Sequence, residues 1–188
     1  NKLGDTGDYR IIGNSTPRFK YGITLDAAWK GFDFSIFMQG IGKRDLWLDG
    51  CYFWGANGQG NEWQSTGFAE HWDFFRPEGD PLGANLNSYY PRVNFSGDRN
   101  TKVQTRYLQN GAYLRLKNVQ LGYTLPRVWT EKAGISSVRV YVSGDNLATI
   151  TSLSKIFDPE ATGSLAGTGS GKLYPLQRVI SVGVNVNF

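Results

Sequence analysis

The chain has 188 residues, a formal charge of +4 and a pI near 9.2, but its Lys and Arg residues are scattered, which argues against nucleic-acid binding. Gly occurs 24 times, aromatic residues make up 14%, and Cys51 has no second thiol with which to build a disulfide framework or a zinc site. No apolar run of about 18 residues is present, which excludes a transmembrane helix but not a transmembrane strand.

The first predicted elements are the two strands of a hairpin. Residues 19–29 alternate apolar and polar side chains, and residues 32–39 repeat this alternation after a tight turn at Lys30 and Gly31. A third strand, at 114–125, changes phase near Asn118, which indicates a β-bulge.

The second half of the chain also predicts strands, preceded by a short helical turn. Residues 126–134 predict one short helical turn, because Pro stands at its start and Gly at its end. Alternation then predicts strands at 138–143 and 180–188. These five strands are about 9 to 14 residues long, enough to cross a bilayer when tilted.

The connections alternate between short and long. Residues 30–31 and 126–136 are short, whereas 42–109 and 148–174 are long, an asymmetry typical of outer-membrane barrels. Five strands cannot close a barrel, and open strand edges are costly in lipid. We therefore expect further strands upstream, the first of which pairs with residues 176–188.

The predicted fold is all-β, a transmembrane antiparallel β-barrel with long extracellular loops, of which this chain is the last five strands. Within that barrel domain, residues 1–17 are an extracellular loop segment and 18–42 a barrel hairpin. Residues 43–111 are a long extracellular loop, and 112–188 the last three strands.

The last eight residues resemble the C-terminal assembly signal of outer-membrane barrels, carried by Ser181, Gly183, Val186 and Phe188. Further segments are similar to the C-terminal region of SusC/RagA transporters: 11–17 (IIGNSTP), 31–33 (GFD), 113–118 (YLRLKN), 121–126 (LGYTLP), 144–147 (GDNL), 158–160 (DPE) and 174–175 (YP).

This resemblance implies a 22-stranded barrel in the outer membrane of Bacteroidota, capped by a SusD-like surface lipoprotein. Such transporters import oligosaccharides or peptides, driven by TonB through an N-terminal region that this chain lacks. Lipid and lipopolysaccharide would surround the barrel, and Arg178 could reach the lipopolysaccharide phosphates. Alternatives are a TonB-dependent siderophore or cobalamin receptor, a passive porin, and a soluble β-sandwich binding module.

Two groups of side chains are candidates for contacts. Loop aromatics could stack on a substrate or meet the lipoprotein, although packing of the loop against itself is the favoured interpretation for any one of them: Trp54, Trp63, Trp72, Tyr89 and Tyr90. Charged residues opposite the apolar faces could meet a plug domain or a solute in the lumen, although they could simply neutralise each other: Lys20, Asp26, Asp33, Arg115, Lys117 and Arg139.

No enzyme, cofactor or metal site is predicted. His71 has no second His and is interpreted as a solvated loop residue. Asp5 and Asp8 lack the ligand spacing of a calcium loop, and neither a catalytic triad nor a phosphate-binding glycine loop is present.

Overall fold

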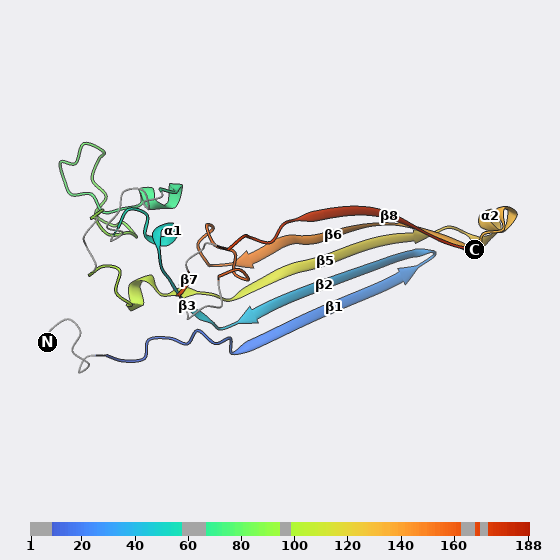
Figure 1. Cartoon of the computed structure of the whole chain (residues 1–188), viewed down its shortest axis with the longest axis horizontal. Helices are drawn as coiled ribbons and strands as arrows, with labels where there is room; N and C mark the ends of the chain where they lie inside the picture. The colour runs from blue at the N-terminus through green and yellow to red at the C-terminus, as the bar shows by residue number, and fades with distance from the viewer. Residues whose placement is uncertain (1–8, 58–66, 95–98, 163–167, 170–172) are drawn as a thin grey trace. The chain divides into compact units, whose positions relative to one another are not determined.

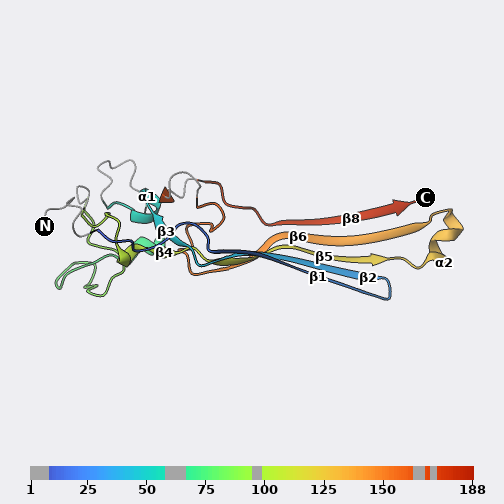
Figure 2. The ribbon, with the colours of Figure 1, turned by 90° about the horizontal axis from the view of Figure 1, so that it is seen from below.

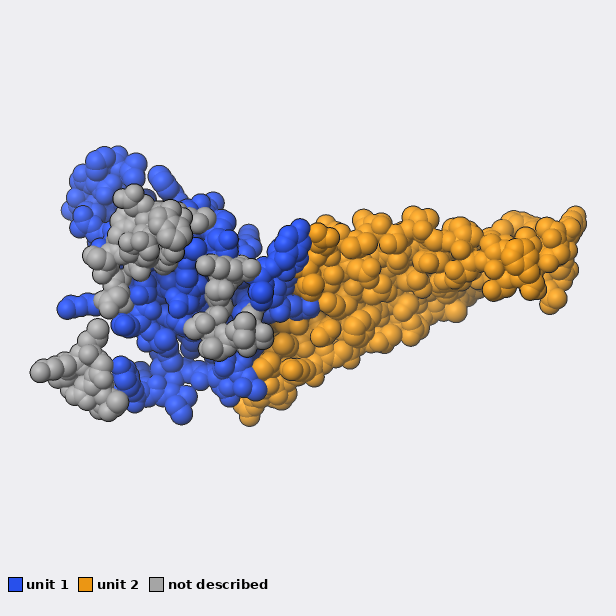
Figure 3. Space-filling view, viewed as in Figure 1, with its two compact units in different colours: residues 1–16, 44–111, 153–175 blue, residues 17–43, 112–152, 176–188 orange. Residues whose placement is uncertain are grey.

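The computed structural model describes residues 9–57, 67–94, 99–162, 168–169 and 173–188 (Figure 1). The chain divides into two compact units, coloured separately in Figure 3. We call residues 17–43, 112–152 and 176–188 the strand unit, and residues 1–16, 44–111 and 153–175 the loop unit.

The strand unit is one antiparallel sheet with the strand order β1-β2-β5-β6-β8. Figure 1 shows these strands side by side in a single sheet, which Figure 2 shows turned by 90°. The strands are β1 (Phe19–Trp29), β2 (Phe32–Gly42), β5 (Tyr113–Thr124), β6 (Ser137–Thr151) and β8 (Val179–Asn187). The five predicted strands are therefore confirmed, and β1 and β8 form the two edges of the sheet.

Short connections join the strands at one end of the sheet. Lys30 and Gly31 link β1 to β2 with φ angles of 46° and 87°, and φ is positive at both central residues of a type I′ hairpin turn. Between β5 and β6 lie α2 (Arg127–Thr130) and η5 (Glu131–Ala133), which end at Gly134 in the left-handed conformation. The predicted helical turn is confirmed.

A β-bulge interrupts the pairing of β5 with both of its neighbours. The register shifts between Phe37 and Met38 against β2, and between Leu116 and Asn118 against β6, so Lys117 is the extra residue. On β6 the matching irregularity contains Asn146, whose φ of 52° is tolerated by a short polar side chain. This confirms the phase change predicted near Asn118.

One face of the sheet is apolar and exposed. On β8, Ile180, Val182 and Val184 are 70%, 77% and 59% exposed. A soluble sandwich would bury such a face against a second sheet. Within the described part of the strand unit, no second layer covers it, so the sandwich alternative is not supported.

The loop unit contains short elements around an aromatic core. They are β3 (Asp45–Leu48), α1 (Cys51–Trp54), η3 (Ala69–Trp72), η4 (Thr105–Tyr107), β4 (Gln109–Asn110) and β7 (Thr168–Gly169). The short strands form a sheet in the order β4-β3-β7, with β3 and β7 parallel. The core comprises Leu46, Trp47, Leu48, Phe53, Trp54, Tyr90, Tyr107, Leu153 and Phe157.

Among the described residues, none of the helices has the length and apolar character required to span a membrane.

Candidate functional site

The polar face of the sheet carries an ion pair that joins two non-adjacent strands. The Nε atom of Arg139 on β6 donates to Oδ1 of Asp33 on β2 at 2.9 Å, and Nη2 pairs with Oδ2. Between them on β5 lies Gly122, where a side chain would collide with both groups. Nη2 of Arg139 also donates to Oε1 of Gln120 at 3.0 Å. A bidentate pair of this kind fixes orientation as well as charge.

Two further contacts continue this polar face beyond the ion pair. The Nδ2 atom of Asn118 donates to Oδ1 of Asp145 at 2.7 Å. Nε of Arg115 donates to Oγ1 of Thr149 at 2.8 Å, and Arg115 is only 4% exposed. The face therefore holds a series of hydrogen-bonded polar groups from β5 and β6.

The six predicted lumen residues occupy different settings. Asp33, Arg115 and Arg139 take part in the contacts above, whereas Lys20 and Asp26 are exposed on β1, and Lys117 lies at the bulge. Sequence reasoning missed Gln120, Asn118 and Asp145 as partners. Their strand parity could have placed them on this face, but not opposite these side chains.

The predicted loop aromatics divide by burial. Trp54 and Tyr90 are 1% and 4% exposed and belong to the core of the loop unit, as the packing alternative predicted, whereas Trp72 is 61% exposed. Tyr89 is half-buried and its hydroxyl accepts a hydrogen bond from Gln109 at 2.7 Å. Trp63, like Asp5 and Asp8, lies outside the described residues. A contact with substrate or lipoprotein stays a prediction for all five aromatics.

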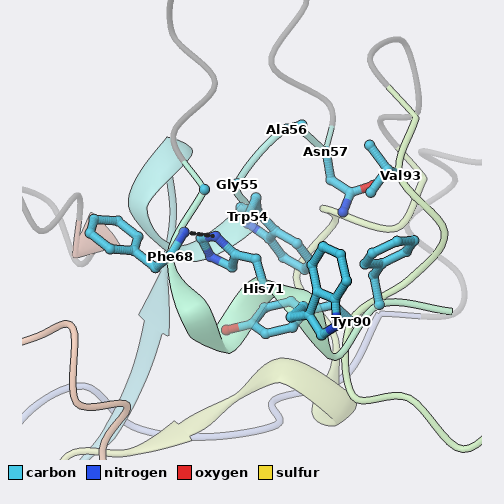
Figure 4. A pocket seen from close by; sticks show the side chains of 11 residues that line it. Trp54, Gly55, Ala56, Asn57, Phe68, His71, Tyr90 and Val93 are labelled. Carbon is cyan, nitrogen blue, oxygen red and sulfur yellow. Dashed lines mark hydrogen bonds between the residues drawn. The ribbon is translucent and has the colours of Figure 1, made fainter. Parts of the chain in front are cut away.

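His71 was interpreted as a solvated loop residue, but its ring is tied into the loop unit. Nδ1 accepts a hydrogen bond from the backbone N–H of Phe68 at 3.1 Å, and Nε2 lies 3.0 Å from the carbonyl oxygen of Phe53 (Figure 4). Because Nδ1 accepts this hydrogen bond, Nε2 is the nitrogen that donates to the Phe53 carbonyl oxygen, and both ring nitrogens are used. The structure corrects the interpretation: His71 joins η3 to α1.

His71 also lines an apolar pocket of about 210 Å³ in the loop unit (Figure 4). Its walls are mostly aromatic, and Asn57 supplies a polar side chain. The lining residues are Trp54, Gly55, Ala56, Asn57, Gly67, Phe68, His71, Trp72, Phe74, Tyr90 and Val93. A cavity of about 150 Å³ holds benzene, so this pocket has room for one ring.

The pocket wall and the loop core include two tyrosines with altered acidity. Burial raises the pKa of the Tyr90 hydroxyl above its usual value of 10.0, and the Glu70 carboxylate adds to this rise. Burial also raises the pKa of Tyr89, against the hydrogen bond from Gln109. Both phenols are held in the neutral form because ionisation inside the core costs free energy.

These pKa shifts predict alkaline sensitivity of the loop unit. A pKa that is higher in the folded state gives stability that is fully present below about pH 10 and is lost as the pH rises further. We expect residues 44–111 to resist proteolysis less at about pH 10.5 than at about pH 8. Tyr90→Phe should reduce this pH effect, whereas Tyr9→Phe, at a position that is 71% exposed, should not. Equal pH effects in all three proteins would contradict the prediction.

The predicted assembly-signal residues lie in or next to the edge strand β8. Ser181, Gly183 and Val186 belong to this strand, and Phe188 follows it and is 90% exposed. The ring of Tyr141 on β6 lies over Gly183, where any side chain would displace it. The part of the four signal residues in barrel assembly stays a prediction.

No protein-family model matches the chain. Two curated relatives from Formosa agariphila do: TonB-dependent receptor P3, 32% identical over 193 residues, and TonB-dependent receptor P26, 28% identical over 193 residues. Each match covers 97% of this chain but 18% of the relative, so the chain spans less than a fifth of the length of these receptors.

Solved structures of an importer also match the chain. The chain superposes on the RagAB peptide importer in its open-open state with a TM-score of 0.72 and 28% identity, and on the RagAB peptide transporter with a TM-score of 0.73 and 27% identity. Both matches cover 95% of this chain and 18% of the matched chain in the solved structure.

The sheet with its exposed apolar face and these matches together define a segment of an outer-membrane protein. More particularly, the chain is similar to a segment of TonB-dependent receptors and of the RagAB importer, in agreement with its motifs.

Proposed function

We propose that the complete protein is a TonB-dependent importer of oligosaccharides or peptides that works with a SusD-like surface lipoprotein. The strand unit then forms the last five strands of a 22-stranded barrel. Its apolar face meets lipid, and its polar face, with Asp33 and Arg139, looks into the lumen. The loop unit lies on the extracellular side.

The observation that carries this proposal is the two-sided sheet with open edges. Strands of 9 to 15 residues have an apolar face left exposed and a polar face joined by hydrogen bonds. An exposed apolar sheet face is costly in water but favourable in hydrocarbon. The open edges of β1 and β8 need partner strands in lipid. Similarity to the RagAB peptide importer makes peptides the first substrates to test.

The test uses the complete, affinity-tagged receptor in its native host. We expect a surface lipoprotein to co-purify with it, and uptake of labelled peptides or oligosaccharides to cease when TonB is deleted. Uptake that persists without TonB would indicate a porin. TonB-dependent uptake of an iron chelate or cobalamin, without a lipoprotein partner, would favour the alternative receptor.

A further inference from the structure

The apolar face of β1 has aromatic residues toward both ends and aliphatic residues in the middle. Phe19, Tyr21 and Trp29 are 57%, 40% and 70% exposed. Ile23 and Leu25 in the middle are 43% and 54% exposed. At the turn end the aromatic residues continue across the sheet. Trp29 pairs with Phe32, and Phe32 pairs with Tyr123 at 4.6 Å between ring centroids. This end therefore carries an aromatic row over three strands.

A cation lies over the aromatic ring at each end of β1. The Arg18 guanidinium is 5.7 Å from the centroid of the Phe19 ring, and the Lys30 ammonium is 4.8 Å from the Trp29 ring. Both distances are within the range of a cation–π contact. Both cations stand immediately outside the alternating segment, where a long side chain can reach phosphates while its stem covers apolar surface.

The length of the segment fits the apolar core of an outer membrane. Ten residue steps from Phe19 to Trp29 span about 33 Å along the strand. At a tilt near 40°, typical of these barrels, that is roughly 25 Å along the membrane normal, the height of the apolar band. Aromatic side chains gather at the two interfaces of such a band because their rings are apolar and their edges polar.

We propose that the two headgroup levels of the membrane lie at Phe19 and Trp29, and that Arg18 and Lys30 each bind the phosphate of an anionic lipid headgroup. The occupant of this surface is lipid because its charge and its height both match: cations at the two rims and an apolar band between them. This inference rests on the membrane location in the proposed function. It requires neither transport nor a lipoprotein partner.

The depth assignment is tested with nitroxide labels on the full receptor in lipid nanodiscs. Single labels are placed through Phe19→Cys, Leu25→Cys and Trp29→Cys, with Cys51→Ser and any other free thiols removed. Relative accessibility to oxygen and to a water-soluble nickel complex should put Leu25 deepest and the other two at phosphate level. Asp26→Cys, on the opposite face, is the control and should show no lipid contact. Equal depth at all three positions, or a deepest point at Phe19 or Trp29, would overturn the assignment.

The headgroup contacts are tested by native mass spectrometry in nanodiscs of phosphatidylcholine with phosphatidylglycerol. Arg18→Gln and Lys30→Gln should each weaken retention of phosphatidylglycerol roughly fivefold, whereas Lys20→Gln, on the polar face, should leave it unchanged. Equal retention in all variants would overturn the phosphate contacts. A receptor that fails to transport but gives the expected depth profile would refute the proposed function and leave this inference standing.

Discussion

Trp54→Ala is expected to destabilise the loop unit by about 3–5 kcal/mol, the usual cost of truncating a buried Trp. Trp54 is 1% exposed. Its ring contacts three others, with centroids 4.8 Å from Tyr107, 5.0 Å from Phe53 and 6.0 Å from Trp47. These residues come from β3, α1 and η4, so the cavity would open where three segments of the loop unit meet. Hydrogen exchange in residues 46–54 and 105–108 of the full receptor should become faster.

Trp72→Ala is the matched control from the same unit. Trp72 is 61% exposed, with the Arg76 guanidinium over its ring and Phe74 in a T-shaped contact. Its truncation should therefore cost under about 1 kcal/mol. Exchange in the strands of the sheet should be unchanged in both variants. Two results would contradict the role of Trp54 in the core. One is unaltered hydrogen exchange in Trp54→Ala, and the other is an acceleration of exchange in Trp72→Ala as large as in Trp54→Ala.

Alternation predicted the sheet because each strand has one apolar face. A one-residue error in reading a strand would move its side chains to the wrong face, so the pattern from Phe19 to Trp29 also fixed which side chains point together. The phase change near Asn118 marked the bulge for the same reason. The family motifs added what alternation could not, the resemblance to SusC/RagA transporters.

Contacts between distant segments could not be predicted. Arg139 and Asp33 are 106 residues apart, and although parity placed both on the polar face, only the register of β2, β5 and β6 brings them together over Gly122. The contacts inside the loop unit were even harder to predict from the sequence. Strands as short as Asp45–Leu48 show no readable alternation, and the burial of Trp54 beside the exposure of Trp72 depends on packing of distant segments. His71 had no sequence signal for its bonds to Phe68 and Phe53.

Gly40→Ala is expected to impair the sheet itself. A Cβ at residue 40 would lie 2.5 Å from the ring of Tyr21 and 2.6 Å from the carbonyl oxygen of Tyr113. The Tyr21 ring can move, but the carbonyl belongs to the ladder between β2 and β5 and can move only if the strands separate. Overpacking of this kind costs about 1–3 kcal/mol. We expect a lower urea midpoint and less heat-modifiable, folded receptor in the outer membrane.

Gly42→Ala, on the same strand, separates this clash from a general intolerance of side chains. A Cβ at residue 42 would meet nothing closer than 3.6 Å, an ordinary contact with Phe19, so this variant should assemble like wild type. Adding Tyr21→Ala to Gly40→Ala removes the ring but not the carbonyl, and should therefore rescue only part of the loss. Complete rescue would show that Tyr21 alone requires the glycine, and normal assembly of Gly40→Ala would show that β2 and β5 can separate at little cost.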